Sequence, residues 1–372
     1  MISFVWEPGI PLPAGTGGSE NYTIGHVREL NLRGVDARVV TIGLGEADGR
    51  HEFVDIPFHA LATVAEVSQI EGTVVFVTDF PVVATMRPAY QILHVPPPRR
   101  DQQRDRMRIQ TRDRALIATS QFAAGLWSDF LDVDVESIDV VYPFAEPCFG
   151  VQSRPTREHD VVRVLYAGRL SPEKGIYTLL AMLHSDLVPA GSEVTFTATS
   201  AGDDKPQGQV IRQLLEAHPR VRLVPSRKSP GAMAALMAEH DVVLMPSNSQ
   251  YWHETFGIVS IEAQHAGCHV VASDDGGLPE TDCGAVTLVV PDDAEALARG
   301  LRDVIVRGPV SHRGRTSAAV RFTVAESVDA LLAVFDRPRK LTPAEVIEEL
   351  EALVGLPPGS GSRTLVSPVP VE

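Results

Sequence analysis

The amino-acid sequence predicts an α/β protein composed of two doubly wound, Rossmann-like domains that face a central cleft. Short apolar runs alternate with amphipathic helical segments along most of the chain, a pattern typical of parallel sheets covered by helices. The alternation lapses over 143–160 and then resumes. A chain of 372 residues also exceeds the size at which a single hydrophobic core stops growing, so we expect two domains.

The first half begins with a strand predicted at Ile2–Trp6. A loop rich in glycine and proline, 7–18, leads into a helix predicted over Ser19–Arg33, with Gly34 as its stop. Further strands are predicted at Ala37–Ile42, Thr73–Val77, Tyr90–Leu93, Leu116–Ala118 and Ile138–Val141.

The second half repeats this alternation after a polar, proline-containing linker. Its predicted strands are Val161–Ala167, Val194–Ala198, Val221–Val224, Val242–Met245, His269–Ala272 and Val286–Val290. Its predicted helices are Pro172–His184, Gln209–Ala217, Gly231–Glu239 and one that begins near Phe256 after a Thr255 cap. Ligands of doubly wound sheets bind beyond the carboxyl ends of the strands, so the loops there are expected to line the cleft.

The chain ends with a helix predicted over Val324–Phe335, another over Pro343–Leu353, and a tail rich in proline, glycine and serine. We therefore predict domains over 1–148 and 149–321, a C-terminal helix at about 322–337 that packs back on the first domain, and an extra helix and flexible tail over 338–372.

The composition of the chain disfavours several classes of function. A net charge of −15 disfavours nucleic-acid binding, which relies on cationic contacts to phosphates. No apolar run approaches the length of a membrane span, and the N-terminus lacks the pattern of a signal peptide, so we expect a cytoplasmic protein. The three cysteines are widely spaced, which indicates neither a disulfide framework nor a zinc site.

One segment is basic, although the chain as a whole has a negative net charge. Arg99–Arg114 contains seven arginines and three aspartates. As a helix it is expected to be basic and solvated. It is interpreted either as an ordinary charged surface or as a peripheral contact to an anionic membrane or acidic acceptor, so that membrane association stays open.

The stretch 245–262 places two carboxylates around a predicted helix start. Glu254 precedes the helix and Glu262 lies inside it, so the two would reach different parts of one ligand. Free N–H groups at such a helix start favour an anion such as a phosphate. Alternatively, Glu254 complements the helix dipole and Glu262 is a solvated helix residue.

Two cations lie at another predicted helix start. Arg169 follows a strand, and Lys174 falls in the first turn after Ser171 and Pro172. Cations there oppose the helix dipole unless an anion lies between them, and a diphosphate would supply that anion. The alternative is a pair of solvated surface side chains.

The first half offers weaker candidates. Gly17 and Gly18 lie between a strand and a helix and permit close approach to a phosphate or sugar, although an ordinary flexible loop fits equally well. His94 follows a strand and is expected on the cleft side, where it could bind a substrate hydroxyl or play a structural role.

The motifs GGSE, GRLSPEKG, HETFGIVSIE and SDDGGLPE, in that order, resemble those of retaining GT-B glycosyltransferases of the family 4 type. The resemblance is strongest over 161–290. It implies that the first domain is the acceptor side and that the second binds a nucleotide-sugar donor, with a UDP- or GDP-sugar favoured. It implies neither a cofactor nor a metal.

The resemblance also implies individual roles. Arg169 and Lys174 would bind the donor diphosphate and stabilise the leaving group. Glu254 and His94 would contact the donor sugar, and Glu262 the ribose. The remaining donor-binding residues would be Gly17, Gly18, Ser226, Arg227, Phe256, Gly257 and Ile258.

The implied function is retaining, metal-independent transfer of a sugar to an acceptor hydroxyl of a small metabolite, a natural product or a lipid-linked glycan. Two alternatives are a non-catalytic nucleotide-sugar-binding partner protein and a GT-B nucleotide-sugar epimerase. The segment 247–253 is longer than the usual family link, and His269 stands where proline is usual.

Overall fold

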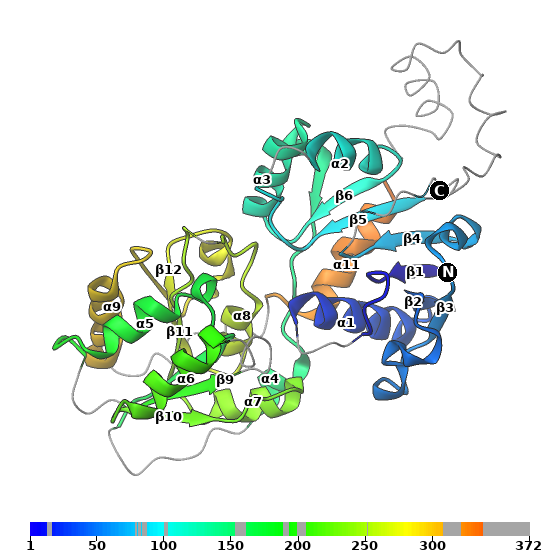
Figure 1. Ribbon diagram of the computed structural model, residues 1–372. Coiled ribbons are helices and arrows are strands. Elements are labelled where there is room, and N and C mark those ends of the chain that lie inside the picture. The colour runs from blue at the N-terminus through cyan, green and yellow to red at the C-terminus, as the bar shows by residue number, and fades with distance from the viewer. Residues whose placement is uncertain are drawn as a thin grey trace.

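The computed structural model describes residues 1–12, 17–78, 80, 83, 88–99, 103–152, 161–188, 193–198, 206–250, 252–307 and 321–337. These residues form two domains, each built on a parallel sheet (Figure 1). The fold class predicted from the sequence is confirmed. The extra helix and tail predicted over 338–372 lie outside the described residues.

The first domain contains a seven-stranded sheet in the order β3-β2-β1-β4-β5-β6-β7. Strand order reverses between β1 and β4, and Ile2 of β1 lies in register with Ala37 on one side and Thr73 on the other. This reversal places the ligand-binding edge of a doubly wound sheet beyond the carboxyl ends of β1 and β4. The strands are β1 (Ile2–Val5), β2 (Ala37–Ile42), β3 (Phe58–Leu61), β4 (Thr73–Phe76), β5 (Ala89–Leu93), β6 (Ala115–Ala118) and β7 (Ile138–Val140).

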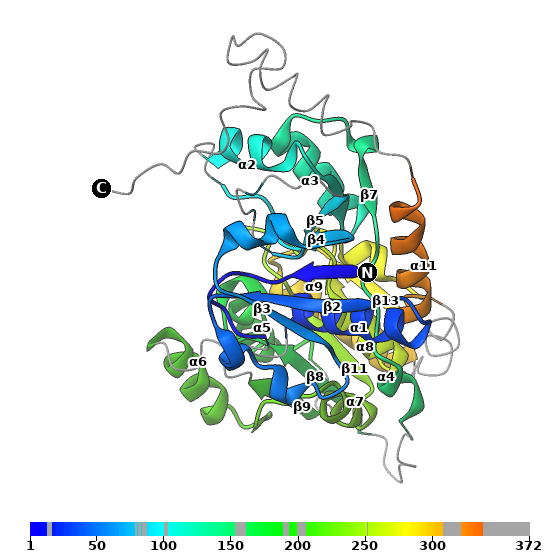
Figure 2. The ribbon, with the colours of Figure 1, turned by 90° about the vertical axis from the view of Figure 1, so that its right-hand side faces the viewer.

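Helices cover both faces of this sheet. On one face, α1 (Gly18–Leu32) and α11 (Val324–Phe335) bury an apolar cluster that includes Phe4, Ile92 and Leu331. On the other face, α3 (Gln121–Leu131) packs through Trp127, and α2 (Arg104–Thr111) lies next to α3. The α11 helix therefore returns from the end of the described chain to the first domain, where it lies beside α1 (Figures 1 and 2).

The second domain contains a six-stranded sheet in the order β10-β9-β8-β11-β12-β13. Here the order reverses between β8 and β11, so loops that follow these two strands line the ligand-binding edge. The strands are β8 (Arg163–Gly168), β9 (Glu193–Ala198), β10 (Val221–Val224), β11 (Val242–Met245), β12 (His269–Ser273) and β13 (Val286–Val289).

Two apolar clusters, one on each face, form the core of this domain. One cluster includes Leu179 and Leu301, and the other includes Ile261 and Phe149. The helices are α4 (Pro147–Val151), α5 (Ile176–Leu183), α6 (Pro206–Ala217), α7 (Pro230–Ala238), α8 (Ile258–His265) and α9 (Ala294–Arg307).

Several local predictions are corrected. Gly175, at φ 69°, divides the helix predicted over 172–184 into a 3-10 turn, Pro172–Lys174, and α5. Inside the predicted linker, α4 packs against α7 and α8, because Phe149 is completely buried in the second core. The prediction omitted β3, an edge strand that buries only Leu61, and also α3 and α9.

Candidate active site

The candidate site begins where β8 and β11 end side by side. The chain leaves β8 at Gly168, forms the 3-10 turn Pro172–Lys174 and enters α5 through Gly175. A Cβ atom on Gly175 would lie 1.5 Å from the carbonyl oxygen of Pro246, directly after β11. Only glycine permits this approach and the positive φ, so the turn that carries Lys174 is fixed against the end of β11.

Lys174 and Glu254 form an ion pair at the centre of the site. The Lys174 Nζ atom donates to Glu254 Oε1, and the Ser247 hydroxyl donates to the same oxygen at 3.0 Å. Burial alone would raise the pKa of Glu254, but the attraction and hydrogen bond of Lys174 outweigh it and hold this pKa below its ordinary value. Glu254 is therefore ionised at neutral pH and oriented by two donors.

Arg169 lies beside this pair. Its guanidinium is half exposed and approaches Glu173 Oε1 at 3.4 Å, and its charge also helps to keep Glu254 ionised. The sequence predicted that two cations gathered here require an anion. Two carboxylates, Glu173 and Glu254, provide negative charge beside these cations.

The α8 helix begins at this edge as predicted, although its cap differs. Gly257, at φ 99°, occupies the N-cap position, and Thr255 does not cap the helix. Instead the Thr255 hydroxyl donates to the carbonyl oxygen of His94 in the first domain at 2.7 Å. An added Cβ on Gly257 would meet Leu278 at 2.6 Å, so glycine is required here as well.

The glycine loop of the first domain lies opposite this helix start. An ideal Cβ on Gly18, the first residue of α1, would lie 3.7 Å from Ile258, the first residue of α8. The starts of these two helices therefore lie close together at the cleft. Both helix dipoles favour an anion at this position.

Gly17 has a separate steric role. A Cβ at this position would lie 2.0 Å from Oε2 of Glu20, because the Glu20 side chain folds back over the start of α1. Gly17 thus leaves room for the carboxylate, whereas a Cβ on Gly18 would make only an ordinary contact with α8.

Glu262 is buried inside α8, with 6% of its surface exposed. Burial, and secondarily the negative charge of Glu146, raise the pKa of Glu262 to about 8. The two carboxylates singled out from the sequence thus differ in state, with Glu254 ionised and Glu262 mostly protonated at neutral pH. Glu262 is therefore not the solvated helix residue considered as the alternative.

His94 follows β5 at the carboxyl edge of the first sheet, as predicted. Its ring meets the ring of Tyr22 edge-on at 4.8 Å, and its Nε2 atom is buried without a hydrogen-bond partner. Burial, together with the charge of His26, lowers the pKa of His94 to about 3. The imidazole is therefore neutral and has one nitrogen available to a ligand.

The other candidates are spread more widely. The Phe256 side chain is buried against Tyr142 and Phe322, which anchors the loop that leads into α8. Ser226 and Arg227 follow β10, an edge strand separated from β8 by β9, so they lie at the far end of the carboxyl edge.

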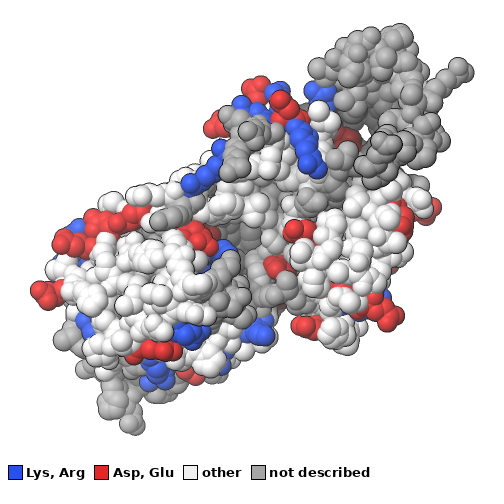
Figure 3. Space-filling view, viewed as in Figure 1, with Lys and Arg blue, Asp and Glu red and all other residues white. Residues whose placement is uncertain are grey.

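Other polar residues at the cleft were not among the predicted site residues. Ser120 donates to the carbonyl oxygen of Thr255, and the Glu280 carboxylate reaches the start of α3. Both contacts join the two domains. The available signals were the position of Ser120 two residues after the end of β6 and that of Glu280 at the end of the GGLPE motif. The molecule is hollowed between the two domains (Figure 3).

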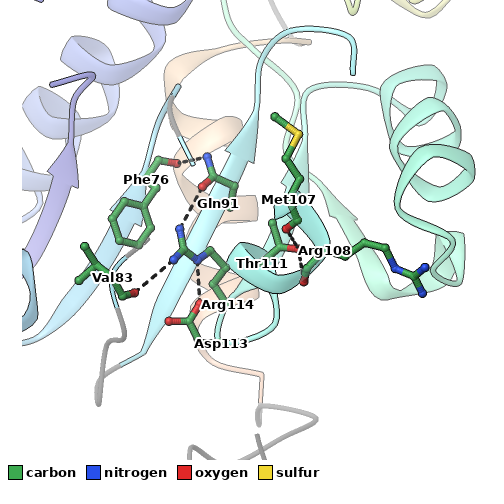
Figure 4. A network of polar contacts seen from close by, with 8 residues as sticks. All are labelled: Phe76, Val83, Gln91, Met107, Arg108, Thr111, Asp113 and Arg114. Carbon is green, nitrogen blue, oxygen red and sulfur yellow. Dashed lines mark hydrogen bonds and ion pairs between the residues drawn. The ribbon is translucent and has the colours of Figure 1, made fainter. Parts of the chain in front are cut away.

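The arginine-rich segment is not the uniformly solvated surface expected. Arg114 is buried, stacks over the Phe76 ring at 4.1 Å, and donates to Gln91 and Val83, as Figure 4 shows. Arg99 donates to the carbonyl oxygen of Gln250 in the second domain at 2.9 Å. Acidic and basic side chains are interspersed on the outer surface of the first domain (Figure 3).

Comparison with known proteins gives the class of this chain. Residues 161–306 match the sequence model of the family described as Glycosyl transferases group 1. The D-inositol 3-phosphate glycosyltransferase of Jonesia denitrificans is 30% identical over 253 residues, which is 60% of this chain and 57% of that protein. The enzyme of the same name from Mycolicibacterium vanbaalenii is 31% identical over 248 residues, 62% and 54% of the respective chains. This chain thus spans slightly more than half the length of these relatives.

Solved structures show the same fold. A glycosyltransferase from Rickettsia africae ESF-5 has a TM-score of 0.71 at 15% identity and covers 90% of this chain and 97% of its own. Anabaena Alr3699/HepE in complex with UDP-glucose has a TM-score of 0.71 at 19% identity, with 90% and 99% covered.

The fold and the layout of the cleft are those of the GT-B class. Residues 161–306, which make up most of the second domain, match the model of the group 1 glycosyltransferases, and the motifs that predicted this resemblance lie mainly in that stretch. In the described part of the chain, no helix combines the length and apolar character needed to cross a membrane. Nor does that part contain a group of three or more His, Cys, Asp or Glu side chains placed to hold a metal ion.

Proposed function

We propose that this protein is a retaining glycosyltransferase that transfers a sugar from a nucleoside-diphosphate sugar to an acceptor hydroxyl without a metal ion. The observation that carries the proposal is the arrangement of Arg169, the Lys174–Glu254 pair and the α8 helix start at one edge of the second sheet. Fixed positive charge at such an edge suits a diphosphate that gains negative charge as it leaves.

Different residues of the site bind different parts of the donor. Arg169, Lys174 and the N–H groups at Gly257 and Ile258 bind the diphosphate, and the start of α1 at Gly18 closes over it. Glu254 accepts hydrogen bonds from sugar hydroxyls, since it is ionised and has no proton to give. Because the proposed partners of Glu254 and Glu262 are sugar and ribose hydroxyls, the two groups do not act as the paired acid and nucleophile of a glycoside hydrolase.

Glu262 is assigned to the ribose. A carboxyl group with a pKa of about 8 is protonated in the free protein, so it can both donate to one ribose hydroxyl and accept from the other. Ser226 and Arg227 are assigned to the base. UDP- and GDP-sugars are the donors proposed, and the complexes of Anabaena Alr3699/HepE with UDP and UDP-glucose favour testing UDP first.

The first domain supplies the acceptor side. Its buried polar atoms without a hydrogen-bond partner include those of Trp6, Tyr22 and Thr119, and Trp6 and Thr119 directly follow strands β1 and β6. Buried donors without partners are costly unless a ligand or water satisfies them. These groups favour a hydroxyl-rich acceptor.

Two acceptor classes are proposed for testing. Because its relatives are named D-inositol 3-phosphate glycosyltransferases, a phosphorylated cyclitol is one acceptor to test. Lipid-linked glycans are another, with membrane contact through the exposed part of Arg99–Arg114, and binding to anionic vesicles would test that contact.

Nucleotide binding is tested first by thermal shift against UDP, GDP, ADP and their hexose derivatives in the presence of EDTA. A rise in Tm with one base identifies the donor class. Turnover is then followed by release of the nucleoside diphosphate, and the anomeric configuration of the product by NMR.

Substitution tests the site. Arg169→Ala and Lys174→Ala should each lower kcat/KM by at least about thirtyfold, equivalent to about 2 kcal/mol of transition-state stabilisation. Turnover within a factor of two of wild type in both variants would exclude this site. Nucleotide binding without turnover on any acceptor would indicate a non-catalytic binding partner, and isomerised donor released without acceptor would indicate an epimerase.

A further inference from the structure

The GGLPE motif packs directly beneath the loop that carries Glu254. The N–H group of Gly277 donates to the carbonyl oxygen of Glu254 at 2.8 Å. A Cβ on Gly276 would lie 2.3 Å from that oxygen, and one on Gly277 would lie 2.3 Å from the carbonyl oxygen of Thr255. The two glycines allow backbone to touch backbone, so the motif and the donor loop, 254–257, are held as one unit.

Glu280, at the end of this motif, reaches from the second domain to the first. Its carboxylate accepts hydrogen bonds from the N–H groups of Gln121 at 2.9 Å and Phe122 at 2.7 Å. These are the first two residues of α3. The phenol of Tyr142, which follows β7, donates to the same carboxylate at 2.8 Å. One side chain thus binds the start of α3 in the first domain and Tyr142 in the chain that connects β7 to the second domain.

The start of α3 is well suited to this contact. The first N–H groups of a helix have no partner within the helix, and the helix dipole favours a negative charge there. Ser120 accepts from the N–H group of Ala123 at 2.9 Å, and Glu280 satisfies the two N–H groups before it. Hydrogen bonds to an ionised acceptor are stronger than neutral ones.

Further contacts join the same donor loop to the first domain. Thr255 accepts from Ser120 through its carbonyl oxygen and donates through its hydroxyl to the carbonyl oxygen of His94. The loop next to Glu254 therefore lies against the residue proposed to bind the donor sugar from the opposite side. Holding the two domains together at Glu280 keeps His94 at the donor site.

We propose that Glu280 is an interdomain latch, a positioning residue whose carboxylate closes the cleft by binding the start of α3 and the phenol of Tyr142. Through the GGLPE motif the latch sets the donor loop against His94. The catalytic benefit rests on the proposed function, whereas the effect on domain closure does not depend on it.

Domain closure is measured by pulsed electron resonance on the full chain, with spin labels at Val54→Cys and Val306→Cys in a Cys148→Ser background. These two positions are 98% and 77% exposed and lie in different domains. Glu280→Gln removes the charge, and Tyr142→Phe removes one hydrogen bond with little risk to folding. Glu66→Gln is the matched control, because Glu66 accepts hydrogen bonds from the N–H groups of Ala62 and Thr63 within one domain.

Glu280→Gln should broaden the distance distribution towards longer separations and lower kcat/KM for the donor about tenfold, with a smaller change of the same sign for Tyr142→Phe. Saturating UDP should restore the shorter distance. Glu66→Gln should leave the distribution unchanged.

Distributions of Glu280→Gln and Tyr142→Phe that both coincide with wild type would overturn the latch, as would an equal change in Glu66→Gln. The distances are measured without turnover. If the variants open the cleft but the wild type transfers no sugar, the latch stands and the proposed function fails. If the wild type transfers sugar but the spin-label distances are the same in the variants as in the wild type, the proposed function stands and the latch fails.

Discussion

Lys174→Met tests the electrostatic centre of the candidate site. Lys174 donates to Glu254, whose side chain is only 13% exposed. Methionine keeps much of the apolar length of lysine and removes its charge. Glu254 is then left buried with the Ser247 hydroxyl, at 3.0 Å, as its remaining side-chain donor.

The expected cost follows from the loss of one partner of a buried ion pair, which is typically about 3–5 kcal/mol. We expect the lower end, about 3 kcal/mol, because the Ser247 hydroxyl and the charge of Arg169 remain and the Lys174 side chain is 27% exposed. For domains of this size, that loss corresponds to a fall in Tm of about 6–12 °C. Differential scanning fluorimetry at pH 7 measures it.

The effect should depend on pH with a definite sign. In the wild type the lowered pKa of Glu254 means that its carboxylate contributes stability above the unfolded-state pKa of about 4.5, and that this is lost as the pH falls through the lower folded-state pKa. Without Lys174, burial becomes the leading effect and raises the folded-state pKa. The ionised carboxylate then destabilises the variant at neutral pH, so the difference in Tm should shrink below about pH 4.5.

The double variant Lys174→Met/Glu254→Gln is the control, since it removes the unpaired charge and should recover most of the lost Tm without recovering turnover. A Lys174→Met protein as stable as wild type at pH 7 would refute this reasoning. So would a deficit that does not shrink in acid.

Three further predictions concern single residues. Gly175→Ala should lower the free energy of unfolding by more than about 2 kcal/mol in urea denaturation, because its φ of 69° is strained for alanine and its Cβ would meet Pro246. Glu262→Gln should make Tm less dependent on pH. The folded-state pKa of about 8 makes the wild type lose on the order of a few kcal/mol of stability as the pH rises from about 4.5 to 8, and the variant lacks this loss. His94→Gln should lower kcat/KM about tenfold without changing the pH profile between 5 and 8, since the pKa of His94 is lowered to about 3.

Much of the fold could be predicted from the sequence because strands of a parallel sheet are buried on both faces and appear as continuous apolar runs. Runs such as Val242–Met245 and Ala37–Ile42 gave the strand bounds directly. The edge strand β3 gave no such signal, because only Leu61 of its four residues is buried. The helix break at Gly175 has no local signal, because it depends on close packing against Pro246, a residue that is far away in the sequence.

The site was predictable only in part, for a related reason. Local patterns placed the cations Arg169 and Lys174 and the carboxylate Glu254 close to predicted helix starts, and the structure brings these three residues to one edge. The contacts that join the domains have no local signature. Thr255 and His94 are 161 residues apart in the chain, and Glu280 and Phe122 are 158 residues apart. Their pairing follows from how the two sheets face each other.

The ion pairs of Arg169 and Lys174 explain how two cations can lie close together at this site. Arg169 and Lys174 lie near a helix start that favours anions, so without partners they would destabilise it. Glu173 and Glu254 neutralise them through ion pairs. We infer that an arriving diphosphate takes over both cations and releases Glu254 towards the sugar hydroxyls. The same lysine would then keep Glu254 ionised before the donor binds and stabilise the leaving phosphate afterwards, which is why Lys174→Met should damage stability and turnover through separate routes.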